Sequence, residues 1–203
     1  MAAAVNRHLV ALALTVPLFL GACGTAVEKS STPVQTQNVK AAADITAGDT
    51  YNDTDVMFLQ MLIDNQDQAL QMVDIAIDRA SRQEVVDLAK AVQATQSDET
   101  AMMKNWLTSW DKPTTLDERV SLHADHGGMP STGDEEIASL KTVKKANFET
   151  AFLNLFLAHQ HNAVEFADLE LDKGANDQAK AYAERVKQSR ADQVQQMLKL
   201  LNS

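Results

Sequence analysis

FLNLFLAHQHNAVEFA, residues 152–167, is the stretch of sequence that decides the fold. Its apolar residues recur three and four positions apart, which is the spacing of one face of an α-helix. Ninety-four positions earlier, without a gap, residues 58–73 read FLQMLIDNQDQALQMV and repeat Phe, Leu, Gln and Ala at equivalent places. The chain therefore contains one helical unit twice.

The repeat continues beyond this stretch. The same offset pairs identical residues further along, namely Asp78 with Asp172, Ala89 with Ala183, Val92 with Val186, Asp98 with Asp192 and Met103 with Met197. Each unit is thus a helical hairpin, and an apolar stripe on a hairpin needs a second hairpin to cover it. The sequence predicts an all-α fold, a four-helix bundle built from two repeated hairpins, with a long central connection that allows a ferritin-like crossover.

The helix limits follow from capping residues. We expect a first helix from Asn52 or Asp53 to about Ala80, since Asn and Asp favour helix starts. A second helix begins at Ser81, with Glu84 completing a capping box, and stops at Pro113. Third and fourth helices span about 146–172 and from about 176 onward, and a short helix at about 134–140 follows the central connection, 111–133.

Composition agrees with a helical, acidic protein. The 203 residues include only seven Gly and four Pro, and the formal net charge is −10. No cluster or stripe of Lys and Arg is present, so the sequence predicts no nucleic-acid binding. The acidity keeps a helical surface soluble, or alternatively presents an acidic face to a cationic partner.

The first 22 residues have the features of a lipoprotein signal peptide. Arg7 and His8 precede an apolar run, residues 9–20, and Leu20-Gly21-Ala22 places small residues before Cys23. This arrangement resembles a bacterial lipobox, which implies lipidation of Cys23 with acyl chains such as palmitate and stable anchoring to a membrane. The alternatives are an ordinary secretory signal or a retained anchor, although about 12 apolar residues are short for a bilayer crossing.

Residues 23–50 are predicted to be the lipidated cysteine and a flexible tether, because Ser, Thr, Gln and Ala dominate and helical periodicity is absent. The bundle domain is predicted to span 51–203. Cys23 is the only cysteine, so the domain contains no disulfide and no thiolate metal cluster.

Residues spread over 52–201 together resemble a known bacterial family. They are Asp55, Phe58, Met61, Ala69, Met72, Leu88-Ala89, Gln96, Glu99, Met103, Trp106-Leu107, His126-Gly127-Gly128-Met129-Pro130, Phe148, Phe152-Leu153, His159, Ala163 and Met197. This pattern is similar to the family called domain of unknown function 305. The resemblance implies a ferritin-like four-helix bundle, often exported or lipid-anchored, without established enzymatic activity, and with copper or other metal handling in some members.

The family usually carries an adjacent His-His pair in each repeat. Here the first pair falls on Asn65-Gln66 and the second on His159-Gln160, so one of four histidines is present. His159 lies among bulky apolar residues and has no good ligand partner three or four positions away. The sequence favours a hydrogen-bonded core histidine, with the three amides as candidate partners, over a metal ligand.

The central connection holds the richest group of ligand types, His123, His126 and Met129, with Asp125 between the histidines. Imidazole and carboxylate suit Cu(II) or Zn(II), and a thioether suits Cu(I). The alternative is a polar, glycine-rich loop whose histidines face solvent or cap a helix.

Enzyme classes find no support. Di-iron proteins of this fold need Glu-x-x-His pairs, and no glutamate here has histidine three residues later. Phosphate loops, nucleophile elbows and His-Glu-x-x-His motifs are also absent. We therefore expect a protein that is not an enzyme.

Two functions remain open. The first is a cell-envelope lipoprotein, lipid-anchored at Cys23 on the extracytoplasmic side, that binds copper or another transition metal through His123, His126, Met129 and His159. The second is a metal-independent module that binds an envelope protein through its helical surface.

Overall fold

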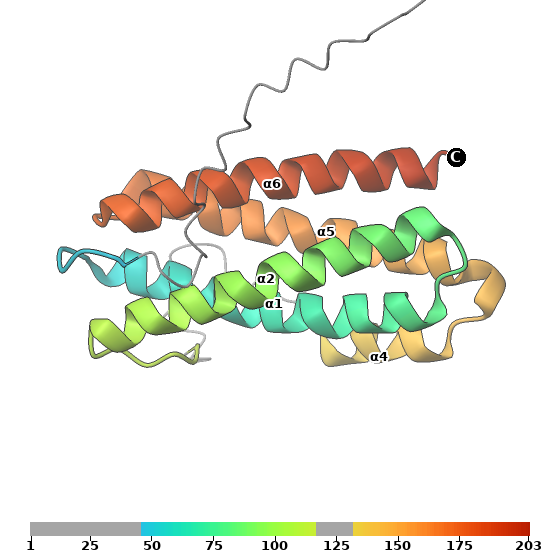
Figure 1. Ribbon diagram of the computed structural model, residues 1–203, viewed down its shortest axis with the longest axis horizontal. Helices are drawn as coiled ribbons and strands as arrows, with labels where there is room; N and C mark the ends of the chain where they lie inside the picture. The colour runs from blue at the N-terminus through green and yellow to red at the C-terminus, as the bar shows by residue number, and fades with distance from the viewer. Residues whose placement is uncertain (1–45, 117–131) are drawn as a thin grey trace, which may run out of the picture. The chain divides into compact units, whose positions relative to one another are not determined.

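The computed structural model describes residues 46–116 and 132–203, in which all regular secondary structure is helical (Figure 1). Four long helices, α1 (Asp53–Arg79), α2 (Gln83–Ser109), α5 (Lys145–Lys173) and α6 (Asp177–Leu201), form a bundle. A short helix, α4 (Asp134–Thr142), packs against α1 and α5. The predicted all-α bundle and the short additional helix are confirmed.

The two hairpins follow the sequence repeat closely. Helix α1 packs against α2, α5 packs against α6, and α1 and α5 join the hairpins. The bounds of α5 and α6 lie within two residues of those that a 94-residue offset from α1 and α2 gives. The repeat in sequence is therefore a repeat in structure.

Asparagine side chains cap the starts of α1 and α6, and the cap of α1 at Asn52 confirms the prediction from the sequence. The Asn52 side chain accepts hydrogen bonds from the backbone N–H groups of Thr54 and Asp55, and the Asp55 side chain accepts one from the Asn52 N–H at 2.6 Å. Asn176 caps α6 in a similar way, through the N–H groups of Gln178 and Ala179. Both caps satisfy N–H groups that a helix leaves free in its first turn.

The predicted capping box of Ser81 and Glu84 is wrong. Helix α2 begins at Gln83, and its N-cap residue makes no side-chain cap. The N–H groups of Ser81 and Arg82 donate instead to the Glu149 carboxylate of α5, at 2.7 and 2.8 Å. The far end of α2 is Ser109, which precedes Pro113 and agrees with a central connection that begins at about 111.

The other hairpin turn is held by the equivalent carboxylate. Asp55, which lies 94 residues before Glu149, accepts hydrogen bonds from the N–H groups of Ala175 and Asn176. The loop of each hairpin is thus bound by an acidic residue near the start of the first helix of the other hairpin. These reciprocal hydrogen bonds fix the register of the two hairpins against each other.

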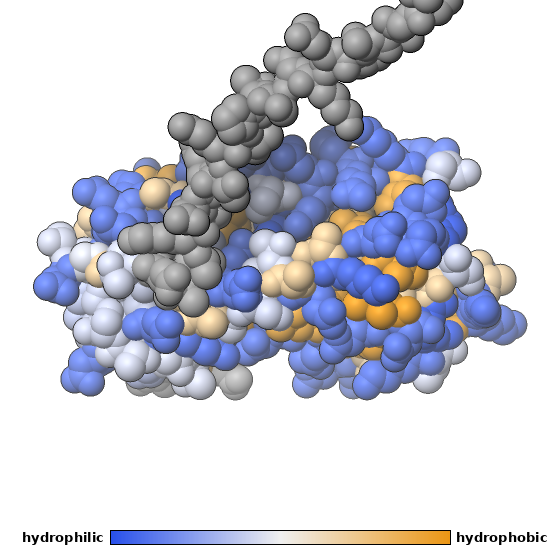
Figure 2. Space-filling model, viewed as in Figure 1, coloured by the Kyte–Doolittle hydropathy of each residue, from blue (hydrophilic) through white to orange (hydrophobic). Residues whose placement is uncertain are grey.

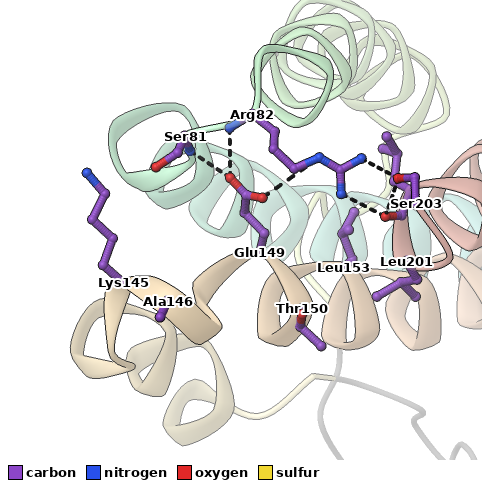
Figure 3. A pocket seen from close by; sticks show the side chains of 10 residues that line it. Ser81, Arg82, Lys145, Ala146, Glu149, Thr150, Leu153, Leu201 and Ser203 are labelled. Atoms are coloured by element: carbon purple, nitrogen blue, oxygen red, sulfur yellow. Dashed lines mark hydrogen bonds and ion pairs between the residues drawn. The ribbon is translucent and has the colours of Figure 1, made fainter.

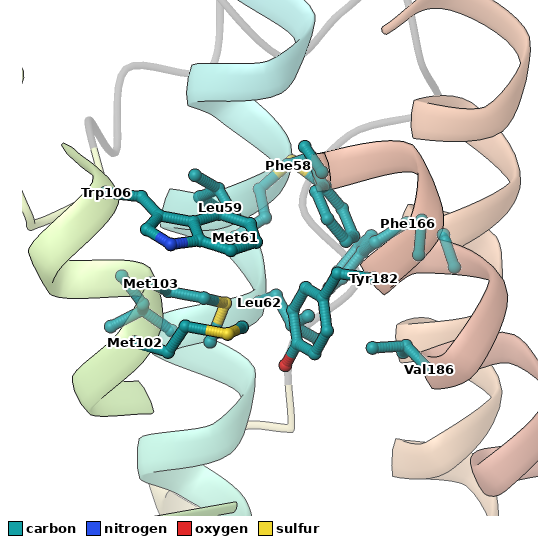
Figure 4. Packing of buried hydrophobic residues seen from close by; sticks show 14 of the residues in the cluster. Phe58, Leu59, Met61, Leu62, Met102, Met103, Trp106, Phe166, Tyr182 and Val186 are labelled. Atoms are coloured by element: carbon teal, nitrogen blue, oxygen red, sulfur yellow. The ribbon is translucent and has the colours of Figure 1, made fainter. Parts of the chain in front are cut away.

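The apolar core consists of two clusters that the repeat relates. One cluster joins the first half of α1 and the second half of α2 to the second half of α5 and the first half of α6, and includes Trp106 and Tyr182 (Figure 4). The other joins the remaining halves and includes Phe148, Phe152 and Phe156. Between the two clusters, the middle of the helices holds a group of buried polar residues, which are Asn65, Gln66, Gln96, Thr100, His159, Gln160 and Arg190.

The end of the predicted tether packs on the bundle. The Trp110 Nε1–H donates to the Gly48 carbonyl at 3.0 Å, and the Tyr51 ring stacks on Trp110 with centroids 4.5 Å apart. Asn176 donates from its amide to the carbonyls of Gly48 and Thr50. The packed domain therefore includes residues before the predicted boundary at 51.

Within the described ranges, no helix has the length and apolar character to cross a membrane.

Candidate functional site

The centre of the bundle is a polar layer in which the two repeats meet. His159 on α5 is fully buried, and its Nε2 lies 2.9 Å from the Asn65 carbonyl of α1. A carbonyl only accepts, so Nε2 carries the hydrogen and donates it. Nδ1 then accepts from the Thr132 hydroxyl at 2.8 Å. Since Asn65 and His159 are equivalent in the repeat, the approximate twofold axis of the bundle passes between them.

Burial keeps His159 uncharged. Desolvation lowers the pKa of His159 from 6.5 to about 4, the hydrogen bond to Asn65 acts in the opposite direction, and the positive charge of Arg190 lowers the pKa further. At neutral pH both ring nitrogens are therefore engaged in hydrogen bonds. In this arrangement His159 has no nitrogen lone pair free for a metal.

One half of the polar layer is a connected hydrogen-bond network. Glu99 Oε2 accepts from Arg190 Nη2 at 2.7 Å and from Gln66 Nε2 at 2.8 Å. The same Gln66 amide also donates to the Tyr182 hydroxyl, and its oxygen accepts from the Thr100 hydroxyl at 2.7 Å. Arg190 is fully buried, so the pairing with Glu99 compensates a charge that burial would otherwise penalise heavily.

A second polar group lies where α1, α5 and α6 meet. Glu170 is fully buried, and its carboxyl group lies next to the carboxylate of Asp55. Burial and the adjacent Asp55 carboxylate raise the pKa of Glu170 from 4.5 to about 9, against the influence of Lys180. Glu170 is therefore protonated at neutral pH, whereas the pKa of Asp55 is lowered, since its hydrogen bonds outweigh the opposing effect of burial.

A pocket of about 440 Å³ opens at the end of the bundle where α2 and α5 begin (Figure 3). Arg82 extends along it and donates to the Leu200 carbonyl and the Ser203 hydroxyl. Glu149 faces the same space while it binds the N–H groups of the turn. Arg82 and Glu149 are thus already partnered within the protein, and Lys145 is the other charged residue that lines the pocket.

Of the predicted site residues, the structure places only His159. Cys23, His123, His126 and Met129 lie outside the described residues. In residues 46–116 and 132–203 no group of three or more His, Cys, Asp or Glu side chains could hold a metal ion. The prediction that His159 is a hydrogen-bonded core histidine agrees with its geometry, and Asn65 is its partner through the backbone carbonyl.

Sequence reasoning missed Arg190 and Glu170. Both are charged residues on helices, where exposure is the usual expectation. The repeat carries a signal for Arg190, because its equivalent is Gln96, a residue of the family pattern that is also fully buried. No comparable signal marks Glu170, whose equivalent is Ala76.

Comparison with known proteins agrees with this architecture. The sequence pattern of the family described as "domain of unknown function (DUF305)" matches residues 55–201. A DUF305 fragment from Deinococcus radiodurans is 23% identical, with 74% of this chain and 97% of that chain covered and a TM-score of 0.64. No curated protein matches the sequence significantly.

Two further solved structures share the fold. A DUF305 protein from Streptomyces coelicolor, described as a presumed secreted protein, is 26% identical over 73% of this chain and 91% of that chain, with a TM-score of 0.67. CopM in its Cu(I)-bound form is 21% identical over 73% of this chain and 95% of that chain, with a TM-score of 0.59.

Proposed function

This chain belongs to the DUF305 family, and on that premise we propose that it is a lipid-anchored, non-enzymatic protein of the bacterial cell envelope that binds copper through its central connection. Two observations support copper. CopM, a protein of the same fold, has a Cu(I)-bound form, and the connection here holds His123, His126 and Met129. Imidazole and thioether together suit copper in both oxidation states.

The helical core does not fit a soft metal ion. Both ring nitrogens of His159 are hydrogen bonded, to Asn65 and Thr132. The neighbouring positions are the amides Gln66 and Gln160, and amide groups bind soft metals poorly. Because these two hydrogen bonds occupy both nitrogens of His159, we assign the metal to the central connection and not to the core.

Metal titration of the protein tests this assignment. We expect Cu(I), measured by competition with a chromophoric chelator, to bind the wild type and to bind much more weakly when His123, His126 and Met129 are all changed to Ala. Two matched controls should keep wild-type affinity: His159→Asn, which introduces the residue of the equivalent position, and His161→Ala, which removes an exposed histidine. Loss of binding in His159→Asn alone would place the metal in the core.

The membrane anchor is tested separately. We expect labelled palmitate to enter the wild type in a bacterial host, and Cys23→Ala to abolish both the label and recovery in the membrane fraction. Unchanged membrane recovery of Cys23→Ala would refute the lipobox interpretation. This result does not depend on the metal.

A metal-independent envelope module is the second candidate. Hydrophilic residues cover much of the visible face of the bundle and surround an apolar patch in the right half of the view (Figure 2). In the described ranges Leu198 is the only large apolar side chain that is exposed. The hydrophilic part of this surface favours a polar contact with a partner over an apolar one. If the protein binds none of Cu(I), Cu(II) and Zn(II) at micromolar concentrations, the metal-independent function is favoured over the first proposal.

A further inference from the structure

The two halves of the central polar layer differ, although the repeat makes them equivalent. In the first half, Glu99 binds Arg190 and Gln66, and Thr100 donates to Gln66. The equivalents in the second half, 94 residues away in sequence, are Gln193 for Glu99, Gln96 for Arg190, Gln160 for Gln66 and Val194 for Thr100. Only one bond of the first half is retained, from the Gln160 amide to Gln193.

The missing bonds leave buried polar atoms without partners. Gln96 and Gln160 are both fully buried. Among residues 46–116 and 132–203, neither the nitrogen nor the oxygen of the Gln96 side chain has a hydrogen-bond partner, and the Gln160 oxygen has none either. Val194, which replaces the hydroxyl donor Thr100, has no hydrogen to offer to Gln160. Buried groups of this kind are normally satisfied, by protein or by ordered water.

The repeat also indicates where these atoms lie. Arg190 and Gln66 bind the same oxygen of Glu99, and in the second half Gln160 binds Gln193. The repeat therefore predicts that Gln96, the equivalent of Arg190, lies on the other side of Gln193. A glutamine side chain is shorter than arginine by two bonds, roughly 2.5 Å. Gln96 therefore stops short of the position that the Arg190 guanidinium reaches, and the difference is about the diameter of a water molecule.

The free atoms define the ligand. They are one donor, Gln96 Nε2, and two acceptors, Gln96 Oε1 and Gln160 Oε1. None carries a formal charge, so a buried ion would lack compensation here. A molecule that both donates and accepts hydrogen bonds matches the set, and a buried water typically makes about three such bonds. We propose that the second half of the polar layer binds one ordered water molecule between Gln96 and Gln160.

Nuclear magnetic resonance of the wild-type protein tests this proposal directly. We expect a nuclear Overhauser peak between water and the side-chain amide protons of Gln96. The sign of this peak should be the one produced by a water molecule that stays bound for longer than the tumbling time of the protein. The Gln66 amide serves as the internal control, because it donates to Glu99 and Tyr182. Assigned Gln96 amide protons without a water peak would overturn the proposal.

Unfolding of Gln96→Leu provides a second, independent measurement. If water is bound, this substitution removes two of its three partners and leaves the Gln160 oxygen unsatisfied, so the urea midpoint should fall. If the site is dry, the substitution removes two unpartnered buried groups, and the midpoint should rise. Gln66→Leu, which removes a hydrogen-bonded glutamine from the first half of the layer, shows how far the urea midpoint falls when such bonds are lost. A rise of the urea midpoint in Gln96→Leu would refute the bound water.

Discussion

Substitution of Glu99 by Gln leaves the buried positive charge of Arg190 without its carboxylate partner. The side chain of Arg190 is 1% exposed and that of Glu99 is 16% exposed, with Nη2 and Oε2 2.7 Å apart. Removal of one partner from a buried ion pair typically destabilises a protein by about 3–5 kcal/mol. Because Glu99 retains some contact with solvent, we expect about 3 kcal/mol for Glu99→Gln. Ser189 is the other residue to which the Arg190 guanidinium donates, and a neutral hydroxyl cannot replace a carboxylate.

The repeat supplies the matched double variant. Glu99→Gln combined with Arg190→Gln reproduces the residues at positions 193 and 96 of the other half-layer, which the fold already accommodates. We therefore expect the double variant to be more stable than Glu99→Gln alone, with a coupling of about 2 kcal/mol between the two sites. Urea unfolding followed by far-ultraviolet circular dichroism measures all four proteins. A loss below about 1 kcal/mol for Glu99→Gln, or simple additivity, would refute the burial argument.

Three further predictions concern protons and caps. The folded state keeps a proton on Glu170 that the unfolded state releases, so stability should fall as pH rises from 4.5 to about 9, and Glu170→Gln should remove that fall in a pH series of urea midpoints. His159 has the opposite sign: stability should fall as pH drops from 6.5 to about 4, a loss absent in His159→Gln. Glu149→Ala should lower the free energy of unfolding by about 1 kcal/mol, the usual value of a helix cap. Asp55→Ala should lower it by about 3 kcal/mol, because Asp55 is fully buried. Equal losses for the two variants in thermal or urea unfolding would contradict this difference.

The helices were predictable because their signals are local. Apolar spacing and the caps at Asn52 and Asn176 lie within single segments, and the structure confirms both helix starts. The predicted Ser81 cap failed because a distant group decides it. The Glu149 carboxylate reaches the N–H groups of that turn from α5. A competition between a local hydroxyl and a distant carboxylate depends on how the hairpins pack, which the local pattern does not contain.

The candidate site was predictable in type but not in detail. The sequence indicates that His159 is buried and hydrogen bonded, and it names Asn65 among the partners. The bond goes to the Asn65 backbone carbonyl, a group that every residue carries and that side-chain chemistry cannot single out. Glu170 shows the same limit, since its raised pKa depends on burial beside Asp55, more than 100 positions earlier in the chain.

The approximate twofold axis gives a physical reason for the difference between Asn65 and His159. Groups at equivalent positions face each other across such an axis, so two neutral imidazoles would each need an acceptor from the opposite helix. One histidine satisfies its donor with the Asn65 carbonyl and its acceptor with Thr132. The Asn65 side chain makes neither of the corresponding bonds, and neither of its polar atoms has a partner in the part of the chain that the structure describes. Hydrogen bonding at the axis is therefore one-sided, like that of the flanking half-layers, and the polar centre has retained the geometry of the repeat while losing its chemical symmetry.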